Sequence, residues 1–416
     1  MNFLEELKWR DLVKDVMDEE ALLKRMETKM TAYCGFDPTA DSLHVGHLQQ
    51  LILLKRYQLQ GHHPIALLGG ATGMVGDPSG KSSERSLQTL EQVSHNVESI
   101  RKQIEQILDV ENNEITVLNN YDWLSQISMI ELLRDYGKYF NVNTMLAKDI
   151  VSSRLDTGIS FTEFSYTILQ AIDWLHLLEH HNCEVQIGGS DQWGNLLSGS
   201  ELIRKKLGHE VEVYGITSPL ITKSDGSKFG KSEGGNVWLN PELTDSYTFY
   251  QFWINSSDQD IEGFLKRLSL KPVDEIKAIL EEHFKAPEKR IAQRELAKEL
   301  TLLVHGQEGL DNALMITDAL FNNDVFSLSV SQLQQAFANA TKVTVSEDQL
   351  LIDALVENKL IQSKREARQL ITQNALELNG KKVEGFDTML TKENALDNSL
   401  SIVKRGKKHY FLIEHI

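Results

Sequence analysis

The chain has 416 residues and carries a formal net charge of −17, with 60 Asp and Glu against 43 Lys and Arg. The length suggests two or three domains, and the acidic balance excludes a diffusely basic nucleic-acid-binding protein. Two cysteines, Cys34 and Cys183, exclude a disulfide framework and a four-cysteine zinc site. With no apolar run near the ~18–20 residues of a membrane span and no signal-peptide segment, we expect a cytoplasmic protein without a membrane partner.

A predicted strand that leads into a helix start is the first informative element. The apolar run 31–36 predicts a buried strand, 37–42 holds turn and cap formers, and a helix runs from His44 to about Leu54. Such a helix start binds anions, because its first N–H groups are unpaired. His44 and His47 share one face, and Gly46 lets a ligand approach the backbone. The alternative is two solvent-facing histidines on an ordinary helix.

A second predicted strand, 64–68, leads into a glycine-rich segment, 69–82. Strand, helix, strand and glycine-rich loop predict the start of a doubly wound α/β sheet. Gly80-Lys81-Ser82 is similar to the end of a Walker A loop, as is the triplet at 230–232. Walker A also requires glycine five positions before the final glycine, where this chain has Val75 and Asp225. A P-loop NTPase is therefore the weaker alternative.

The middle of the chain is predicted to be mostly helical. Periodicity favours a helix over 84–108, a strand follows at 115–118, and 121–160 predicts several helices. The helix at 161–180 is apolar on most sides and is expected to be buried. A narrow polar stripe at i, i+4 and i+7 crosses it, formed by Tyr166, Gln170 and Asp173. Because buried polar groups need partners, we expect a polar ligand there rather than solvent.

Another strand and glycine-rich turn follow. The strand at 184–187 precedes 188–193, which forms a second crevice of the kind that binds ligands in open α/β sheets. On its own, this glycine-rich turn is also an ordinary helix N-cap signal. After a strand at 211–216, the segment 224–232 carries Lys228 and Lys231 around a glycine. Such a loop neutralises charge on phosphate, although an exposed basic loop is the commoner explanation of a lysine pair.

The composition changes toward the C-terminus. Residues 245–322 predict helices, and the polar segment 323–349 is expected to be a loosely structured connection. Residues 350–416 contain eleven Lys and Arg against nine Asp and Glu, a net charge of +2. A serine-capped helix at 363–371 precedes an Asn-Gly hairpin at 375–383, a pattern suited to RNA. A basic domain without RNA chemistry is the alternative.

The motifs His44-Val45-Gly46-His47 and Lys228-Phe229-Gly230-Lys231-Ser232 together resemble the two signatures of class I aminoacyl-tRNA synthetases. Their surroundings resemble the bacterial tyrosyl-tRNA synthetases, over essentially the whole chain. The resemblance implies an α/β fold with a doubly wound parallel sheet, a helical insertion, a helical domain and a small C-terminal α+β RNA-binding domain. The implied ranges are a catalytic core at 1–222 with a dimerisation insertion at 121–160, a lysine-loop segment at 223–244, a helical domain at 245–322, a linker at 323–349 and an RNA-binding domain at 350–416.

The resemblance also implies roles for individual residues. Asp173 and Tyr33 would bind the phenol of L-tyrosine, and Asp77, Tyr166, Gln170 and Gln192 would bind its ammonium and carboxylate end. The implied catalytic residues are Thr39, His44, His47, Lys228, Lys231 and Ser232, with Lys81 and Arg85 as a mobile pair beside the phosphates. The implied ATP-binding residues are Cys34, Gly35, Asp37, Gly46, Gly189, Asp191, Ile221 and Lys231. The implied tRNA contacts are Arg204, Lys205, Lys364, Arg365 and Arg368, although Arg204 and Lys205 also suit an exposed last helical turn.

The expected reaction has two steps. The tyrosine carboxylate attacks the α-phosphate of ATP, and the tyrosyl group is then transferred to the 3′ end of tRNA(Tyr). ATP would arrive with Mg²⁺ and no dedicated metal cage, and a homodimer is implied. Phe229 and Gly230 depart from the commonest spelling of the lysine motif, and no role is assigned to Gln50. A non-catalytic RNA-binding relative is the second alternative beside the NTPase.

Overall fold

The computed structural model describes residues 1–79, 88–152, 154–155, 158–224, 229–232, 235–406 and 409–416, with the backbone alone at 149, 150, 231 and 232. The chain forms two compact units. The first comprises Met1–Thr244 and Gln251–His305, and the second comprises Asp245–Tyr250 and Gly306–Ile416. No helix of the described residues is long and apolar enough to cross a membrane.

A six-stranded sheet organises the first unit. Its order is β1-β6-β5-β2-β3-β4, and all neighbours are parallel except β1, which pairs antiparallel with β6. The strands are β1 Asp15–Val16, β2 Thr31–Phe36, β3 His63–Leu68, β4 Thr116–Asn119, β5 Cys183–Gly189 and β6 Tyr214–Ser218. From β2 the chain builds outward to β3 and β4 on one side and later to β5 and β6 on the other. The predicted doubly wound parallel sheet is therefore confirmed.

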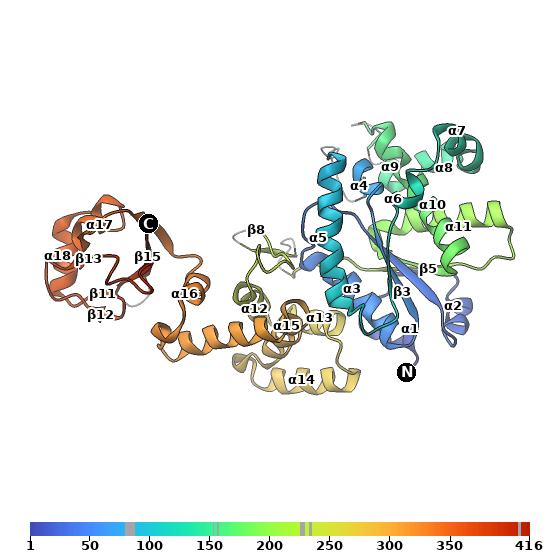
Figure 1. Cartoon of the computed structure of the whole chain (residues 1–416). Helices are drawn as coiled ribbons and strands as arrows, with labels where there is room; N and C mark the ends of the chain where they lie inside the picture. The colour runs from blue at the N-terminus through green and yellow to red at the C-terminus, as the bar shows by residue number, and fades with distance from the viewer. Residues whose placement is uncertain (80–87, 153, 156–157, 225–228, 233–234, 407–408) are drawn as a thin grey trace. The chain divides into compact units, whose positions relative to one another are not determined.

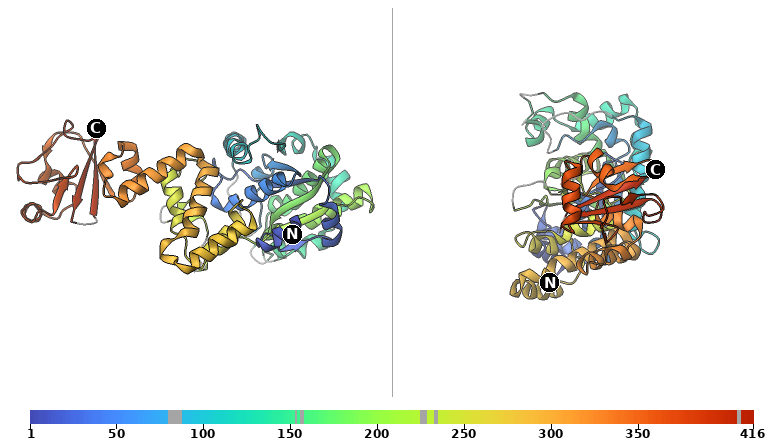
Figure 2. Two further views of the ribbon diagram at one scale, coloured as in Figure 1. Left: turned by 90° about the horizontal axis from the view of Figure 1, so that it is seen from below. Right: turned by 90° about the vertical axis from the view of Figure 1, so that its left-hand side faces the viewer.

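Helices cover both faces of this sheet (Figures 1 and 2). The covering helices are α3 Val45–Leu59 and α5 Leu90–Leu108 on one face, and α10 Phe161–His181 and α11 Trp193–Leu207 on the other. Side chains alternate along β2, so that Tyr33 packs in the cluster with Ile172 and Trp174 of α10. Adjacent residues of β2 therefore point toward opposite faces of the sheet.

Shorter elements complete the first unit. They are α1 Phe3–Trp9, α2 Glu19–Arg25, α4 Thr72–Val75, η3 Ser190–Gln192, β7 Lys231–Ser232 and β8 Gly235–Asn236. The segment predicted as a helical insertion contains α6 Tyr121–Leu124, α7 Met129–Glu131, η1 Leu132–Tyr136, η2 Gly137–Tyr139, α8 Val142–Leu146 and α9 Asp149–Ser152. The predicted helical region contains α12 Ser246–Ile254, α13 Ile261–Leu268, α14 Val273–Lys285, η4 Pro287–Lys289 and α15 Ile291–Phe321.

Helix α10 is buried or half-buried from 163 to 178, as the prediction of a buried helix requires, and is exposed at its two ends. Asp173, Trp174 and Leu177 are buried, whereas Phe161 is 76% exposed at the first turn. Phe161 is the one apolar side chain of α10 that is exposed in the described part of the chain.

The second unit contains a five-stranded sheet of order β12-β11-β14-β15-β9, whose strands are drawn in red and orange in Figure 2. Its elements are η5 Val325–Ser327, α16 Val330–Ala336, β9 Thr341–Val345, β10 Gln349–Leu350, α17 Leu351–Glu357, α18 Lys364–Thr372, β11 Leu376–Leu378, β12 Lys381–Lys382, β13 Met389–Leu390, β14 Leu400–Arg405 and β15 His409–His415. The predicted hairpin is confirmed: β11 and β12 pair antiparallel around Asn379 (φ 46°) and Gly380 (φ 79°).

The prediction that 323–349 is a loosely structured linker is wrong. It contains α16 and β9, and β9 pairs in parallel with β15 from Phe411↔Thr341 to His415↔Val345. The strand was missed because its side chains are mostly exposed and carry little apolar alternation. The division between units falls instead at Gly306, where α15 departs from helical geometry with φ 70°. The other functional boundaries stay predictions.

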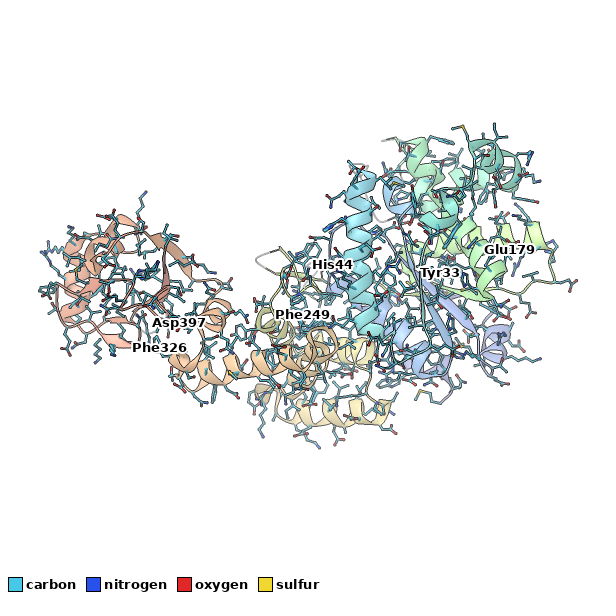
Figure 3. All side chains as sticks on the ribbon, in the orientation of Figure 1. Tyr33, His44, Glu179, Phe249, Phe326 and Asp397 are labelled. Carbon is cyan, nitrogen blue, oxygen red and sulfur yellow. The ribbon has the colours of Figure 1, made fainter. Side chains whose placement is uncertain are left out.

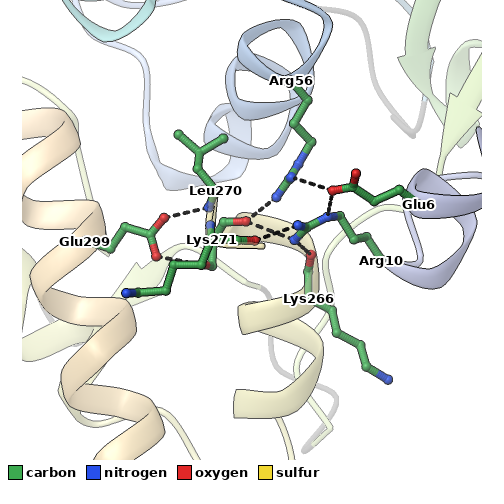
Figure 4. Close-up of polar contacts among 8 residues, drawn as sticks. Glu6, Arg10, Arg56, Lys266, Leu270, Lys271 and Glu299 are labelled. Atoms are coloured by element: carbon green, nitrogen blue, oxygen red, sulfur yellow. Dashed lines mark hydrogen bonds and ion pairs between the residues drawn. The ribbon is translucent and has the colours of Figure 1, made fainter. Parts of the chain in front are cut away.

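A buried arginine network joins α1 and α3 to the helices after the sheet (Figure 4). Arg10, 1% exposed, pairs with Glu6 at 2.7 Å and donates to the carbonyl oxygens of Ser269 at 3.1 Å and Lys271 at 2.7 Å. Arg56 donates to the same Ser269 carbonyl. These bonds fix the turn that follows α13 against the sheet unit.

Replacing Arg10 with alanine is expected to lower the free energy of unfolding by about 3 kcal/mol, because buried carbonyl groups lose a charged donor. Chemical denaturation followed by circular dichroism measures the change. Lys8→Ala, which removes an exposed pair with Glu19, is the matched control and is expected to cost less than about 0.5 kcal/mol. Equal losses in the two variants would contradict a specific role for the Arg10 network.

Candidate active site

The predicted site residues gather where the parallel strands of the first unit end. Tyr33 lies on β2, and His44 begins α3 shortly after that strand (Figure 3). Strand β2 pairs with β3 on one side and β5 on the other, so its carboxyl end lies at the point where the winding direction reverses. Ligands bind at this point in open α/β sheets.

The start of α3 presents two imidazole rings together. His44 is the N-cap, and its Nδ1 accepts the Gly46 N–H at 3.0 Å. The Nδ1 of His47 accepts the His44 N–H at 3.2 Å, and the two ring centroids lie 4.1 Å apart. Burial lowers the pKa of His44, so its ring is neutral. Because Nδ1 accepts a backbone N–H in both rings, Nε2 carries a proton in each, and both rings offer an N–H donor to an anion.

The described end of the lysine segment lies against this helix start. A β-carbon built on Gly230 would lie 3.1 Å from Val45 Cγ2 and 3.7 Å from the Gly46 nitrogen. The Gly230 carbonyl accepts from Val237, whose own carbonyl accepts from Val45 at 3.0 Å. Gly230 also has φ 84°, a conformation that favours glycine. The two motifs, although about 180 residues apart, therefore share one side of the sheet.

Phe229 anchors the same segment on its other side. Its ring centroid lies 5.9 Å from Phe252, 6.0 Å from Trp253 and 5.2 Å from Phe264. Trp253 is fully buried and Phe264 is nearly so, and both rings therefore give Phe229 an apolar environment. The unusual phenylalanine of this motif thus fixes the backbone beside Gly230.

A buried carboxylate, that of Asp173, and a buried phenol, that of Tyr33, lie on the opposite side of β2 from the start of α3. Tyr33 and Asp173 are each 2% exposed, and the Tyr33 hydroxyl has no hydrogen-bond partner within the described part of the chain. Asn120 Nδ2 donates to Asp173 Oδ2 at 2.9 Å, and Trp123 Nε1 donates to Oδ1 at 2.8 Å. Burial raises the pKa of Asp173 to about 8, although these two donors favour its ionised form.

The polar stripe of α10 continues into a hydrogen-bonded chain. The Tyr166 hydroxyl donates to Asp37 Oδ2 at 2.9 Å, and the Thr72 hydroxyl donates to Asp37 Oδ1 at 2.8 Å. Asn120 Nδ2 links Thr72, at 3.0 Å, to the Asp173 carboxylate. Asp37, which the resemblance assigned to ATP, therefore bonds directly to Tyr166, which the resemblance assigned to tyrosine.

A second polar group surrounds Asp77. Gln192 Nε2 donates to Asp77 Oδ2 at 2.7 Å, and the Ser79 N–H donates to Oδ1 at 2.9 Å. Gln170 presents a buried Oε1 atom without a partner among the described residues. Burial, and then the charge of Asp77, raise the pKa of Asp191 in η3. The β5 turn thus brings the carboxylates of Asp77 and Asp191 close to the amide of Gln192.

The remaining predicted residues fall in three places. Cys34 and Gly35 lie on β2, Gly46 lies in α3, and Thr39, Gly189 and Ile221 lie at or just beyond strand ends. Lys81, Arg85 and Lys228 lie outside the described residues, and Lys231 and Ser232 are described only as the backbone of β7. Gln50, which had no assignment, donates through Nε2 to the Ser218 hydroxyl at 2.9 Å.

The predicted tRNA contacts lie on two helices. Arg204 and Lys205 end α11, and Lys205 is held by Glu201 at 2.6 Å and by the Tyr139 carbonyl at 2.7 Å. In the second unit, Arg365 and Arg368 are exposed on α18, and Lys364 pairs with Asp353 at 2.7 Å. Ser363 caps α18 as predicted, because it accepts the Glu366 N–H.

Sequence reasoning missed Thr72, Asn120 and Trp123, which hold the two central carboxylates. For two of them, their position in the chain could have indicated a role in the site. Asn120 directly follows β4, and Thr72 follows β3 by four residues, so both lie where parallel strands end. Residues at these ends meet at one edge of the sheet, which a search for residue types alone does not use.

Two family models match the chain. The model described as "tRNA synthetases class I (W and Y)" matches residues 24–322, and "Tyrosine--tRNA ligase SYY-like C-terminal domain" matches residues 332–413. The second match begins before β9, in agreement with the extended second unit.

Named relatives cover the whole length. The chain is 50% identical to "Tyrosine--tRNA ligase 1" of Bacillus cereus, over 100% of both chains. It is 51% identical to "Tyrosine--tRNA ligase" of Bacillus pumilus over 99% of both. A C-terminally truncated mitochondrial tyrosyl-tRNA synthetase of Aspergillus nidulans superposes with a TM-score of 0.68 and 32% identity, covering 76% of this chain and 94% of the other. The tyrosyl-tRNA synthetase of Archaeoglobus fulgidus, at 19% identity and TM-score 0.55, shares the fold over 74% of this chain and 100% of the other.

Proposed function

The chain belongs to the tyrosine–tRNA ligase family of class I aminoacyl-tRNA synthetases, and from that premise we propose which residues carry each part of the reaction. Its activity is the ligation of tyrosine to tRNA(Tyr) with consumption of ATP. The observation that carries the assignment of the amino-acid site is the buried pair of Tyr33 and Asp173, because a hydroxyl without a partner and a carboxylate suit the phenol of the substrate.

In the proposed amino-acid site, Asp173 accepts the substrate phenol O–H, and the Tyr33 hydroxyl completes the hydrogen bonds of that oxygen. Asn120 and Trp123 hold the Asp173 carboxylate, which supports this role. The substrate ammonium binds among the oxygens of Tyr166, Gln170 and Asp77. Tyr166 donates to Asp37 and Gln192 donates to Asp77, which supports a further role of Asp37 beside the substrate ammonium.

In the proposed activation step, the tyrosine carboxylate attacks the α-phosphorus of ATP, and pyrophosphate leaves. His44 and His47 donate from Nε2 to phosphate oxygens, beside the positive end of α3. Thr39, Ser232, Lys228 and Lys231 neutralise charge on the departing pyrophosphate, with Lys81 and Arg85 nearby. The adenosine portion lies along Cys34, Gly35, Gly46, Gly189, Asp191 and Ile221. ATP is taken as its Mg²⁺ complex, with the metal on phosphate oxygens and water.

In the proposed transfer step, the ribose hydroxyl at the tRNA 3′ end attacks the tyrosyl carbonyl and releases AMP. Exposed Arg365 and Arg368 on α18, with Lys364, suit phosphate contacts, and Arg204 is the exposed candidate on α11. We also propose a homodimer through the insertion, because apolar side chains there, Met129 at 75% and Ile130 at 69%, are exposed.

The test of the amino-acid assignment is ATP–pyrophosphate exchange in parallel reactions with tyrosine, phenylalanine and no amino acid. Exchange that requires tyrosine is the expected result. ATP turnover without any amino acid would favour an NTPase, and the absence of turnover with retained RNA binding would favour a non-catalytic relative.

Removal of residues 323–416 is expected to abolish tRNA charging and to leave tyrosine-dependent exchange. Charging should fall by about 100-fold or more, because the basic residues of α18 and β12 supply phosphate contacts. The cut keeps α15 whole and removes β9 together with the sheet it joins. Aminoacylation with labelled tyrosine measures the change, beside exchange on the same preparation. Loss of both activities would mean that the second unit is needed for the catalytic fold itself.

A further inference from the structure

A stack of three rings backs the carboxylate of Asp173. The ring centroids of Trp123 and His176 lie 4.2 Å apart with their planes 11° from parallel. His180 stacks on the other side of His176 at 4.1 Å and 19°, and its Nδ1 lies 3.0 Å from the His176 carbonyl. The rings form a continuous stack from exposed His180 to the half-buried indole of Trp123.

The indole needs this support, because its own element is short. Trp123 belongs to α6, a single turn without a side-chain cap. Asn120, at the start of that turn, uses its side chain on Ala71, Thr72 and Asp173 instead. The indole packs beside the core cluster of α10, and two contacts set its direction: its N–H on Asp173 Oδ1 at 2.8 Å and its face on His176.

His176 and Asp173 lie three residues apart on α10, so both points belong to one rigid helix. Burial, with smaller contributions from the charges of His180 and His181, lowers the pKa of His176 to about 4. The ring is thus neutral near pH 7 and stacks as an uncharged aromatic group. A neutral ring also adds no charge beside the Asp173 carboxylate.

We propose that His176 is a positioning residue for tyrosine selection: it stacks on Trp123 and thereby aims the indole N–H at the carboxylate that accepts the substrate phenol. This inference rests on the proposed function and assigns to the same site a residue that contacts neither substrate nor carboxylate. The stack is expected to affect the binding of tyrosine and not of ATP, because His44 and His47, the proposed phosphate-binding residues, lie at the start of α3 and not in the α10 cluster that contains Tyr33.

His176→Ala is expected to raise KM for tyrosine about three- to tenfold, with kcat changed less than about twofold, because one stacked ring pair is lost. KM for ATP should stay unchanged, and selectivity for tyrosine over phenylalanine should fall with the rise in KM. His176→Phe keeps a stacking ring and should restore both. Tyrosine-dependent ATP–pyrophosphate exchange measures all of these values.

The double variant with Trp123→Phe separates positioning from general stability. Trp123→Phe keeps a ring on His176 but removes the N–H donor, so His176→Ala should add less than about twofold to KM in that background. Additive losses, an unchanged KM in His176→Ala, or equal losses in His176→Ala and His176→Phe would overturn the inference. A wild-type chain without tyrosine-dependent exchange would overturn the proposed function instead, which keeps the two failures distinct.

Discussion

Above the pKa of Asp173 of about 8, where the carboxyl group is mostly ionised, replacing this residue with asparagine is expected to lower kcat/KM for tyrosine by about 100-fold, because the charged acceptor is lost from a buried site. Asparagine offers one oxygen and one NH₂ group. One of the two donors that now bond to the carboxylate, Asn120 or Trp123, would then face another donor. The variant should accordingly lose affinity for the phenol while it keeps its fold.

The discrimination against phenylalanine should fall together with kcat/KM for tyrosine in Asp173→Asn. Tyrosyl-tRNA synthetases reject phenylalanine by about 10⁵, a value established for the family rather than obtained from this structure. Phenylalanine has no hydroxyl to bond to Tyr33 or Asp173, so the Tyr33 hydroxyl stays without a partner and the Asp173 carboxylate keeps only Asn120 and Trp123, which produces the rejection. In the variant the cost of leaving this position without a substrate hydroxyl is smaller, because asparagine is uncharged. The selectivity for tyrosine over phenylalanine should therefore drop to about 10³.

The same residue should control the pH dependence of tyrosine binding. Burial raises the pKa of Asp173 to about 8, so the carboxyl group is largely protonated at lower pH and accepts a phenol proton poorly. KM for tyrosine should fall as pH rises from about 6.5 to about 8.5, because the ionised form becomes dominant. Asp173→Asn should lack this slope, since the amide does not titrate.

Exchange assays with tyrosine and phenylalanine at several pH values measure both effects. Glu179→Gln is the matched control, because Glu179 is an exposed carboxylate on the same helix (Figure 3). It should change neither selectivity nor the pH slope. Unchanged selectivity in Asp173→Asn would remove this residue from the phenol site.

Replacing Lys231 with alanine is expected to slow adenylate formation by about 10²–10³-fold with little change in tyrosine affinity. The reason is that the ammonium group acts on charge that develops as pyrophosphate leaves, and not on bound tyrosine. The position of the segment supports this, since Gly230, the preceding residue, packs against Val45 at the start of α3.

Single-turnover adenylate formation and equilibrium tyrosine binding separate the two quantities for Lys231→Ala. Lys277→Ala is the control, an exposed lysine of α14 that pairs with Asp274. It should match the wild type in both measurements. A parallel loss of rate and tyrosine affinity in Lys231→Ala would refute a transition-state role.

Periodicity and motif spacing predicted most of the first unit. The strand at 31–36 is β2 Thr31–Phe36, and the helix predicted at 161–180 is α10 Phe161–His181. These elements were accessible because apolar periods and turn formers act locally. The helix start at His44 was predictable for the same reason, since an N-cap depends on neighbours within one turn.

Contacts between distant elements were not predictable in this way. Trp123 and Asn120 bond to Asp173 only because β4 and α10 meet at one sheet edge, about 50 residues apart in the chain. Strand β9 depends on pairing with β15 rather than on its own apolar pattern. The stack of His176 on Trp123 likewise arises from the approach of two helices. Long-range geometry, rather than local propensity, decided these parts of the site.

The most direct test of the central claim is a crystal structure of the chain with a non-hydrolysable tyrosyl-adenylate analogue. We predict the phenol oxygen within hydrogen-bonding distance of Tyr33 and Asp173, and the linking group that replaces the α-phosphate beside His44, His47 and Gly230. An analogue bound with its phenol away from Asp173, or with its phosphate mimic remote from the start of α3, would contradict the account.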